Sequence, residues 1–325
     1  MTPASMRVAR LHGVGDLRVE TVPVSQPASG ELLVRVEACG VCPTDVRKFV
    51  LGLHPEEYPL NPGHEWVGRV EAVGAGVEGW AAGDRLYGDT YAGYAEYAVL
   101  RARADGWSAG AVRLDDDLPL DRAVFVEPLA DCLHAVLDQA RVGPEDRVLV
   151  VGAGQMGLQL VAVAARTARR VLAADGVPER RALAAELGAA TVVGSDEWAA
   201  AARSFRPTAA ILSIGEASLV EDLLDVLEPG GRLVLFAGFG DRPGATLDLN
   251  RIHYRELSVV GSEWIGTPPN ARPERYAEAA ALLGSGEVPV ERLVTGHCGL
   301  DGLVDAFAAV RELRGLKTVL LPGTA

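Results

Sequence analysis

The chain has 325 residues, 49% of them hydrophobic, and carries a formal net charge of −13. This length predicts two domains with sizeable cores. The acidic balance argues against nucleic acid or an anionic membrane as a partner, because both attract clustered Lys and Arg. No apolar run reaches the roughly 18 residues that a membrane span needs, the N-terminus lacks a secretory signal, and four cysteines are too few for a disulfide scaffold. We therefore expect a cytoplasmic protein.

The residue pattern changes from strand-like runs to alternating strands and helices along the chain. The first hundred or so residues contain alternating, strand-like runs broken by Gly and Pro, at 17–24, 31–38 and 63–74. From about residue 120, helical patterns alternate with short apolar strands, the helices at 127–140, 156–168 and 178–188 and the strands at 147–154, 170–175, 209–214 and 231–239. Strand–helix alternation predicts a parallel sheet that is covered on both faces. The tail is mixed, with helices near 274–286 and 302–313 and a last strand at 316–322.

A glycine-rich turn links the apolar strand that begins at residue 147 to the next helix. Gly152, Gly154 and Gly157 form a G-x-G-x-x-G pattern, and the following strand ends in Asp175. The glycines allow a tight turn and close approach to a pyrophosphate, which the helix N-terminus attracts. A carboxylate at Asp175 accepts hydrogen bonds from the ribose hydroxyls and repels a 2′-phosphate, which favours NAD over NADP. Arg180 and Arg181 follow closely and weaken this preference slightly.

The sequence Ala38–Asp45, ACGVCPTD, raises a separate question, because two cysteines three positions apart have several uses. A redox pair is one, since a helix N-terminus lowers the pKa of a thiol. A zinc ribbon is another, but it needs a second cysteine pair, and Cys132 and Cys298 are isolated. A third is a site in which one cysteine acts together with His64 and Glu65 of a Pro/Gly-bounded turn.

Glu127 lies further along, at an otherwise apolar helix start. One thiolate, one imidazole and one or two carboxylates form a tetrahedral zinc set that leaves a position open for water or substrate. That is the catalytic arrangement of zinc. The alternative for Glu127 is a carboxylate in favourable contact with the helix dipole.

Motifs in a fixed order give the chain a family resemblance over nearly its whole length: CGVCPTD, PGHEWVG, EPLADCLHA, VGAGQMG with Asp175, and LKTVLLP. They resemble the medium-chain dehydrogenase/reductase family, the zinc-dependent alcohol and polyol dehydrogenases. The resemblance implies a GroES-like, partly open β-barrel catalytic domain at 1–128 and 265–325. It also implies a Rossmann domain with a doubly wound parallel sheet at 129–264.

By this resemblance, Cys42, His64, Glu65 and Glu127 are the candidate metal ligands. Glu65 either lies behind the metal or binds it directly, and Glu127 binds it directly or only through water. Cys39 falls where the family has no ligand. Asp45 matches the carboxylate that orients the ligand histidine.

Two further roles come from the same comparison of motifs. Thr44 matches the hydroxyl that bonds the substrate oxygen. Lys317 matches a basic residue that approaches the cofactor pyrophosphate, with a solvated surface lysine as the alternative.

The sequence departs from the family pattern in three places. The cysteine-rich lobe that holds a structural zinc is missing between Tyr87 and Tyr97, which implies one catalytic zinc per chain. Arg47 replaces the usual relay histidine, and a guanidinium cannot release a proton at neutral pH, so the proton leaves Thr44 through the ribose or water. Alternatively, Arg47 faces the cofactor phosphates. Pro43 stiffens the turn after Cys42.

The expected function is zinc-dependent interconversion of a secondary alcohol, of polyol, sugar or cyclitol type, and its ketone with NAD. By position, Asp89, Thr90, Tyr91, Glu263 and Trp264 line the pocket, unless Asp89 and Glu263 simply face solvent. Two alternatives stay open: a zinc-free quinone or enoyl reductase that uses NADPH, and a non-catalytic NAD-binding relative. The family forms homodimers or homotetramers, usually through edge strands near 231–239.

Overall fold

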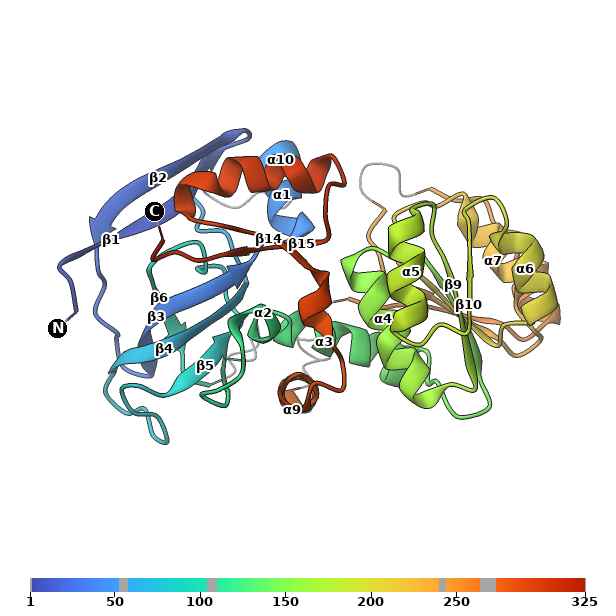
Figure 1. Ribbon diagram of the computed structural model, residues 1–325, viewed down its shortest axis with the longest axis horizontal. Helices are drawn as coiled ribbons and strands as arrows, with labels where there is room; N and C mark the ends of the chain where they lie inside the picture. The colour runs from blue at the N-terminus through green and yellow to red at the C-terminus, as the bar shows by residue number, and fades with distance from the viewer. Residues whose placement is uncertain (1, 53–57, 104–109, 240–243, 264–272, 325) are drawn as a thin grey trace. The chain divides into compact units, whose positions relative to one another are not determined.

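The computed structural model describes residues 2–52, 58–103, 110–239, 244–263 and 273–324. The chain divides into two compact units, each with its own sheet (Figure 1). Unit 1 is Met1–Pro128 with Ile265–Ala325, and unit 2 is Leu129–Trp264. None of the helices in the described ranges combines the length and hydrophobicity that a membrane crossing requires. Trp264, one of the expected pocket residues, lies outside the described residues.

Unit 1 is built on a curved, mostly antiparallel sheet in the order β14-β15-β3-β4-β5-β7, with β6 paired to β3 and a separate β1-β2 hairpin. Its strands are β1 (Ser5–Gly13), β2 (Asp16–Pro23), β3 (Glu31–Gly40), β4 (Glu65–Val73), β5 (Arg85–Gly88), β6 (Tyr97–Arg101), β7 (Ala111–Arg113), β14 (Val294–Cys298) and β15 (Lys317–Leu320). Leu32, Val34 and Val36 of β3 alternate into the core of this unit, as period-2 patterning requires.

The C-terminal strand completes the sheet of unit 1. β15 pairs antiparallel with the end of β3, where Val319 lies opposite Gly40 and Leu320 opposite Cys39. On its other side, the end of β3 pairs with the start of β4, so that Gly40 lies opposite Glu65. Three segments distant in sequence therefore meet where β3 ends.

Helices surround this sheet. They are α1 (Pro43–Leu51), α2 (Leu120–Ala123), α9 (Pro273–Ser285) and α10 (Leu303–Arg311), with 3₁₀ turns η2 (Val290–Leu293) and η3 (Leu300–Gly302). α1 packs beside α10 (Figure 1). A bidentate ion pair between Arg122 of α2 and Glu291 of η2, at 2.9 and 3.0 Å, joins the two sequence segments of unit 1. α3 (Val126–Leu133) begins in unit 1 and ends in unit 2.

Unit 2 has an all-parallel sheet in the order β10-β9-β8-β11-β12-β13. The strands are β8 (Arg147–Val151), β9 (Arg170–Ala174), β10 (Thr191–Val193), β11 (Ala209–Leu212), β12 (Arg232–Leu235) and β13 (Ser258–Gly261). Numbered within the unit, this is the order 3-2-1-4-5-6 of the Rossmann fold. The expected fold class, a doubly wound parallel sheet beside a β-rich domain, is confirmed.

The helices of unit 2 cover both faces of its sheet, with α4 and α5 on one face and α6 and α7 on the other (Figure 1). They are α4 (Gln155–Thr167), α5 (Pro178–Glu186), α6 (Trp198–Phe205), α7 (Leu219–Val226) and α8 (Leu249–Tyr254), preceded by a π-helical turn, η1 (His134–Gln139). Leu149, Leu172 and Leu212 of the central strands form one core with the apolar side chains of α6 and α7.

The expected position of the edge strand is wrong. β12, which contains most of the apolar run at 231–239, pairs on one side with β11 and on the other with β13. Hydrogen bonds to neighbouring strands therefore occupy both edges of β12, and β13 is the outermost strand on this side of the sheet. The apolar run at 231–239 can be taken for the edge strand only if β13, the next strand in the sequence, is overlooked.

Candidate metal centre and nucleotide site

The candidate metal centre begins where β3 gives way to α1. Cys42 is the N-cap residue of α1 in extended conformation, and Pro43 occupies the first helical turn. Proline suits that position, because its fixed φ favours the helix and the missing N–H would have no helical partner. Thr44 and Asp45 follow in the same turn, with Asp45 buried and Thr44 half-buried.

Three of the predicted ligands converge. His64 directly precedes β4 and Glu65 is its first residue. One ligand atom each from Cys42, His64 and Glu65 lies within 4.8 Å of the others. A thiolate, an imidazole and a carboxylate at this spacing match the donor types of catalytic zinc sites. The residues therefore fit a single divalent ion.

Glu127 is not part of this converging set in the described chain. It lies buried in the first turn of α3, and the helix-start contact proposed as its alternative fits that position. Burial, followed by the charge of Glu127, raises the pKa of the Tyr87 phenol well above its usual range. Glu127 is therefore close enough to influence the site electrostatically.

Asp45 supports His64 from behind. One carboxylate oxygen accepts a hydrogen bond from the Gly63 backbone N–H at 3.1 Å. The other accepts one from the Tyr94 hydroxyl at 2.9 Å and lies 3.5 Å from Nδ1 of His64. Burial alone would raise the pKa of Asp45, but the charge of His64 and these hydrogen bonds lower it.

Burial and neighbouring charges favour the protonated forms of the Cys42 thiol and the His64 imidazole. Burial raises the pKa of the Cys42 thiol, and the carboxylate of Glu65 adds to this effect. Burial would lower the pKa of His64, but the negative charges of Asp45 and Cys42 raise it well above its usual range. Since metal ligation requires a thiolate and a neutral imidazole, binding releases protons from this pair.

Cys39 does not take part. Its side chain is fully buried in the unit 1 core, and burial raises the pKa of its thiol well above the usual range. An inaccessible thiol with a raised pKa is unsuited to exchange chemistry. The redox-pair alternative for Cys39 and Cys42 therefore disagrees with the structure.

Lys317 occupies a place that the sequence did not predict. Its Nζ lies 2.5 Å from Oε2 of Glu65, and both side chains are buried. The solvated alternative is wrong, because the β15–β3 pairing carries Lys317 into the interior. Gly40 makes room for the pair, since a Cβ there would lie 2.1 Å from the same Glu65 oxygen. Contact between Lys317 and a cofactor stays a prediction.

The expected pocket residues differ in exposure. Asp89 is buried and accepts a hydrogen bond from the Tyr276 hydroxyl at 3.1 Å, so the suggestion that it faces solvent is wrong. Glu263 is exposed. The ring of Tyr91 lies 5.0 Å from that of His64, centroid to centroid. Thr90 accepts a hydrogen bond from the Trp66 indole through its backbone carbonyl.

Two tyrosines of the site could not be identified from the sequence. Tyr94 holds Asp45 and Tyr276 holds Asp89, yet both lie in apolar patterns that are typical of core positions. The available signal for Tyr94 was its position near the end of a glycine-rich turn that faces the ligand loop. For Tyr276 there was none, because 187 residues separate it from Asp89.

The glycine-rich turn of unit 2 has the geometry that its sequence requires. Gly152 follows β8 with φ +93°, a region that favours glycine. Gly154 is the N-cap residue of α4. A Cβ on Gly157 would lie 1.8 Å from the Gly152 carbonyl oxygen, so only glycine allows the helix to approach the strand this closely.

Asp175 stands at the end of β9, next to this turn. Its carboxylate accepts hydrogen bonds from the backbone N–H groups of Ala153 at 2.7 Å and Val177 at 2.8 Å. The Arg181 guanidinium donates a hydrogen bond to the Asp175 backbone carbonyl at 2.8 Å and so has a structural role. Arg180 is half-buried in α5, and its expected contact with the cofactor stays a prediction.

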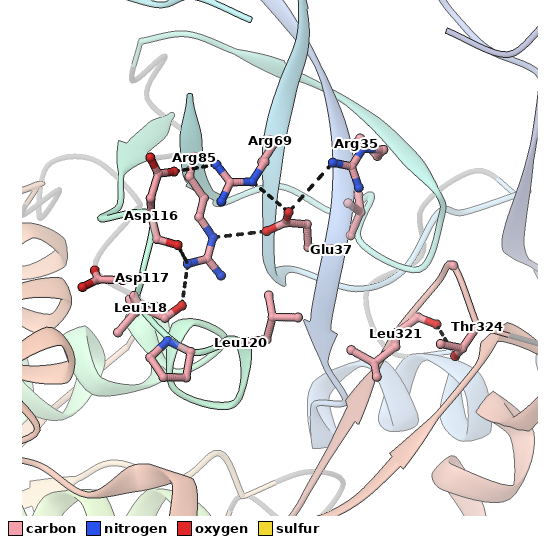
Figure 2. Close-up of a pocket in the computed structure, with 13 residues that line it drawn as sticks. Arg35, Glu37, Arg69, Arg85, Asp116, Asp117, Leu118, Leu120, Leu321 and Thr324 are labelled. Atoms are coloured by element: carbon pink, nitrogen blue, oxygen red, sulfur yellow. Dashed lines mark hydrogen bonds and ion pairs between the residues drawn. The ribbon is translucent and has the colours of Figure 1, made fainter. Parts of the chain in front are cut away.

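A pocket of about 610 Å³ lies elsewhere in unit 1 and is not the candidate catalytic site (Figure 2). At its wall, the Glu37 carboxylate accepts hydrogen bonds from Nε of Arg69 at 3.0 Å and Nε of Arg85 at 3.1 Å. Arg69 also pairs with Asp116 at 2.5 Å. These charged groups pair with one another and join β3, β4 and β5 to the segment that contains Asp116. The cluster is therefore structural.

Comparisons with known proteins agree with this geometry. The family model described as "Alcohol dehydrogenase GroES-like domain" matches residues 28–110, and the one described as "Zinc-binding dehydrogenase" matches residues 152–285. An erythritol/L-threitol dehydrogenase of Mycolicibacterium smegmatis is 29% identical, with 98% of both chains covered. A sorbitol dehydrogenase of Bombyx mori is 27% identical over 96% of this chain and 97% of its own.

Solved structures with the same fold are also found. A zinc-binding dehydrogenase of Sinorhizobium meliloti 1021, bound to NADP, superposes with a TM-score of 0.88 at 25% identity and covers 98% of this chain and 100% of its own. An alcohol dehydrogenase of E. coli CFT073 in complex with NADH superposes with a TM-score of 0.86 at 24% identity, with 98% and 100% covered. The two neighbours hold different nicotinamide cofactors.

Proposed function

Because the chain belongs to the zinc-type medium-chain dehydrogenase/reductase family, we propose that it interconverts a secondary alcohol and its ketone by hydride transfer with NAD. The observation that carries the proposal is the convergence of Cys42, His64 and Glu65 within unit 1. The two relatives named above, an erythritol/L-threitol dehydrogenase and a sorbitol dehydrogenase, support an alcohol of the polyol class.

Cys42, His64 and Glu65 would hold the ion, with Glu127 as a further candidate. When bound, Zn²⁺ supplies Lewis acidity that lowers the pKa of an alcohol oxygen toward neutrality. Asp45 and Tyr94 keep the His64 ring in place, and Lys317 balances the charge of Glu65.

The proton of the alcohol leaves by way of Thr44. Its hydroxyl lies in the first turn of α1, two residues after Cys42, and is suited to accept a hydrogen bond from the alcohol while it passes its own proton on to the ribose or to water. When bound, NAD would supply a nicotinamide ring whose C4 takes up the carbinol hydrogen with its bonding electrons, so that the alcohol becomes a ketone. Arg47 is exposed and cannot act as a proton acceptor.

Unit 2 binds the cofactor in this proposal, with Gly152, Gly154 and Gly157 against the pyrophosphate and Asp175 at the adenosine ribose. The negative charge of Asp175 supports NAD over NADP. One zinc per chain, a homodimer or homotetramer, and a cytoplasmic location are the accompanying proposals.

The test combines metal analysis with a substrate panel. Purified protein is expected to hold about one zinc per chain and to reduce NAD in the presence of polyols, cyclitols or simple secondary alcohols. The variant Cys42→Ser should lose zinc and activity together. Cys298→Ser is the matched control, because Cys298 is a lone, half-buried cysteine of the same unit and should leave both unchanged.

Two outcomes would contradict the proposal. Metal-free protein that reduces a C=C bond with NADPH would favour the quinone or enoyl reductase alternative. Zinc-loaded protein that binds NAD but converts none of the alcohols or ketones would favour the non-catalytic alternative.

A further inference from the structure

Two glutamines lie on one face of the first helix that follows the glycine-rich turn of unit 2. Gln155 is the first residue of α4, and Gln159 lies four residues later, where side chains of an α-helix are neighbours. Both are buried, with 8% and 1% of their surface exposed. Because a buried polar group is costly unless it is hydrogen-bonded, this pair needs a reason for its position among the mostly apolar buried residues of α4.

The contacts of Gln159 determine which way both amides point. Its Nε2 donates to the backbone carbonyl oxygen of Gln155 at 3.0 Å and to the side-chain Oε1 of Gln155 at 3.3 Å. A backbone carbonyl oxygen only accepts hydrogen bonds, so the arm of Gln159 that reaches it is the nitrogen. The arm of Gln155 that faces this nitrogen is then the oxygen. The NH₂ group of Gln155 is therefore on the arm that is turned away from Gln159.

This NH₂ group finds no acceptor among the residues that the structure describes. Since Gln159 follows Gln155 by one helical turn, an arm turned away from Gln159 faces the start of α4 and the glycine-rich turn. The first backbone N–H groups of the helix, which have no partner within the helix, lie at the same end. Together these donors suit an anion, because the helix N-terminus is the positive end of the helix dipole.

Gln159 contributes little to the fold itself. Its Oε1 is buried and has no hydrogen-bond partner in the described part of the chain. A leucine would fill this position without leaving an unsatisfied polar atom, so a glutamine is unfavourable here for stability alone. Apart from a contact at 3.8 Å with the sulfur of Met156, the hydrogen bonds of its Nε2 are to Gln155. What Gln159 supplies is the orientation of the Gln155 amide.

We propose that Gln155 is a cofactor-binding residue whose side-chain NH₂ donates a hydrogen bond to the pyrophosphate of the dinucleotide, and that Gln159 is the positioning residue that orients it. The inference rests on the cofactor site proposed above and adds side chains to the backbone donors of its turn. A hydrogen bond to a charged oxygen is stronger than one between neutral groups. The competing explanation is that the two glutamines only pack α4 against its neighbours.

Binding of NADH, followed by its fluorescence, and its displacement by ADP-ribose or adenosine separate these explanations, because adenosine lacks the pyrophosphate. Gln155→Leu should weaken binding of NADH and ADP-ribose roughly tenfold and change that of adenosine by no more than about twofold. Gln155→Glu keeps the shape of the side chain but places a carboxylate against the pyrophosphate. It should therefore weaken ADP-ribose binding further, roughly 100-fold.

Gln159→Leu tests the positioning residue with two readouts. The variant leaves the Gln155 amide free to turn, so ADP-ribose binding should weaken about three- to tenfold while adenosine binding is kept. It also removes the unsatisfied Oε1, so hydrogen exchange of α4 peptides in the cofactor-free protein should stay equal or become slower. A residue that acts only in packing would give faster exchange and an unchanged ratio of ADP-ribose to adenosine affinity.

The matched control is Gln139→Leu. Gln139 is a half-buried glutamine of the same unit, but its amide already pairs with Nε2 of His134 at 3.0 Å. It precedes β8, whereas the glycine-rich turn follows β8. The variant makes the same chemical change and should keep the wild-type affinities for all three probes.

Side-chain NMR signals report the contact without any turnover. Protein labelled with ¹⁵N at the glutamine side chains should give four pairs of NH₂ signals, since the chain has four glutamines. Gln155→Leu removes one pair and so assigns it, and the remaining pairs show that the variant is folded. Adding ADP-ribose to the wild type should shift the Gln155 pair, and adding adenosine should not.

The outcomes distinguish this inference from the proposed function. Oxidation of an alcohol with NAD, together with ADP-ribose binding that Gln155→Leu leaves unchanged, overturns the role of Gln155 while the dehydrogenase proposal stands. An equal loss for ADP-ribose and adenosine also overturns it, in favour of a packing role. A selective loss for ADP-ribose, in a protein that oxidises no alcohol, supports the role of Gln155 and rejects the dehydrogenase. A wild type that binds neither NADH nor ADP-ribose overturns both the inference and the proposed cofactor.

Discussion

Replacing Lys317 by methionine should destabilise unit 1 strongly. The substitution keeps the length of the side chain but removes the ammonium that lies 2.5 Å from Glu65. The Glu65 carboxylate is then buried without its partner. Breaking a buried ion pair in this way costs about 3–5 kcal/mol, a large part of the roughly 5–15 kcal/mol that stabilises a typical domain.

The loss of stability in Lys317→Met should be measurable near neutral pH, where the wild-type Lys317 carries its charge. Burial lowers the pKa of Lys317, but the charges of Glu65, Cys42 and Glu127 and the hydrogen bond to Glu65 together outweigh it, and the pKa is raised. A raised lysine pKa gives stability that is complete below the unfolded-state pKa and is lost only as the pH rises through the folded-state value. Lys317 is therefore charged throughout the neutral range in the wild type.

Hydrogen exchange of metal-free protein is the suitable assay, because the two units can unfold separately. Peptides from β4 and β15 should exchange roughly 10²- to 10³-fold faster in Lys317→Met. The double variant Glu65→Gln/Lys317→Met should recover much of the loss, since no unpaired charge is left. Arg18→Met, which breaks an exposed pair with Asp16, is the control and should leave these peptides unchanged.

Two results would refute the reasoning. One is exchange in Lys317→Met within a factor of five or so of the wild type, which corresponds to about 1 kcal/mol. The other is a double variant that is as unstable as the sum of the two single variants. Either would mean that water or another group already compensates Glu65 in the folded protein.

Three further predictions concern other contacts. Tyr94→Phe removes one hydrogen bond to Asp45 and should weaken zinc binding about tenfold, measured by chelator competition; an unchanged affinity would exclude a positioning role. Asp175→Asn should raise KM for NAD roughly 10- to 100-fold and that for NADP less, measured by steady-state kinetics; an equal rise would contradict the ribose assignment. Burial would raise the pKa of Asp146, but hydrogen bonds from Thr208, Gly143 and Arg232 lower it, so the Asp146 carboxylate should stabilise unit 2 above about pH 4 and lose this effect on acidification. Urea unfolding of Asp146→Asn at several pH values should show the difference from the wild type vanish at low pH.

The sequence by itself determined the features that are encoded locally. Gly152, Gly154 and Gly157 follow an apolar strand and precede a helix, and the turn that joins them admits only a narrow range of side chains. The strand–helix alternation predicted the parallel sheet, because periodicity reports directly which faces are covered. Short strands such as Thr191–Val193 and Ser258–Gly261 escaped, since three or four residues show no clear period.

Only the tertiary structure decided how the site is supported. Lys317 reaches Glu65 across 252 residues because β15 pairs with β3, and no local pattern records that register. In the sequence Tyr94 looks like a core residue and Lys48 like a surface residue, yet the Tyr94 hydroxyl donates to Asp45 and the buried Lys48 ammonium lies over the Tyr91 ring. Motifs identify which groups perform chemistry, because their spacing is fixed by local turns. Their charge balance depends on strand pairing and packing between distant segments, which is a property of the folded chain.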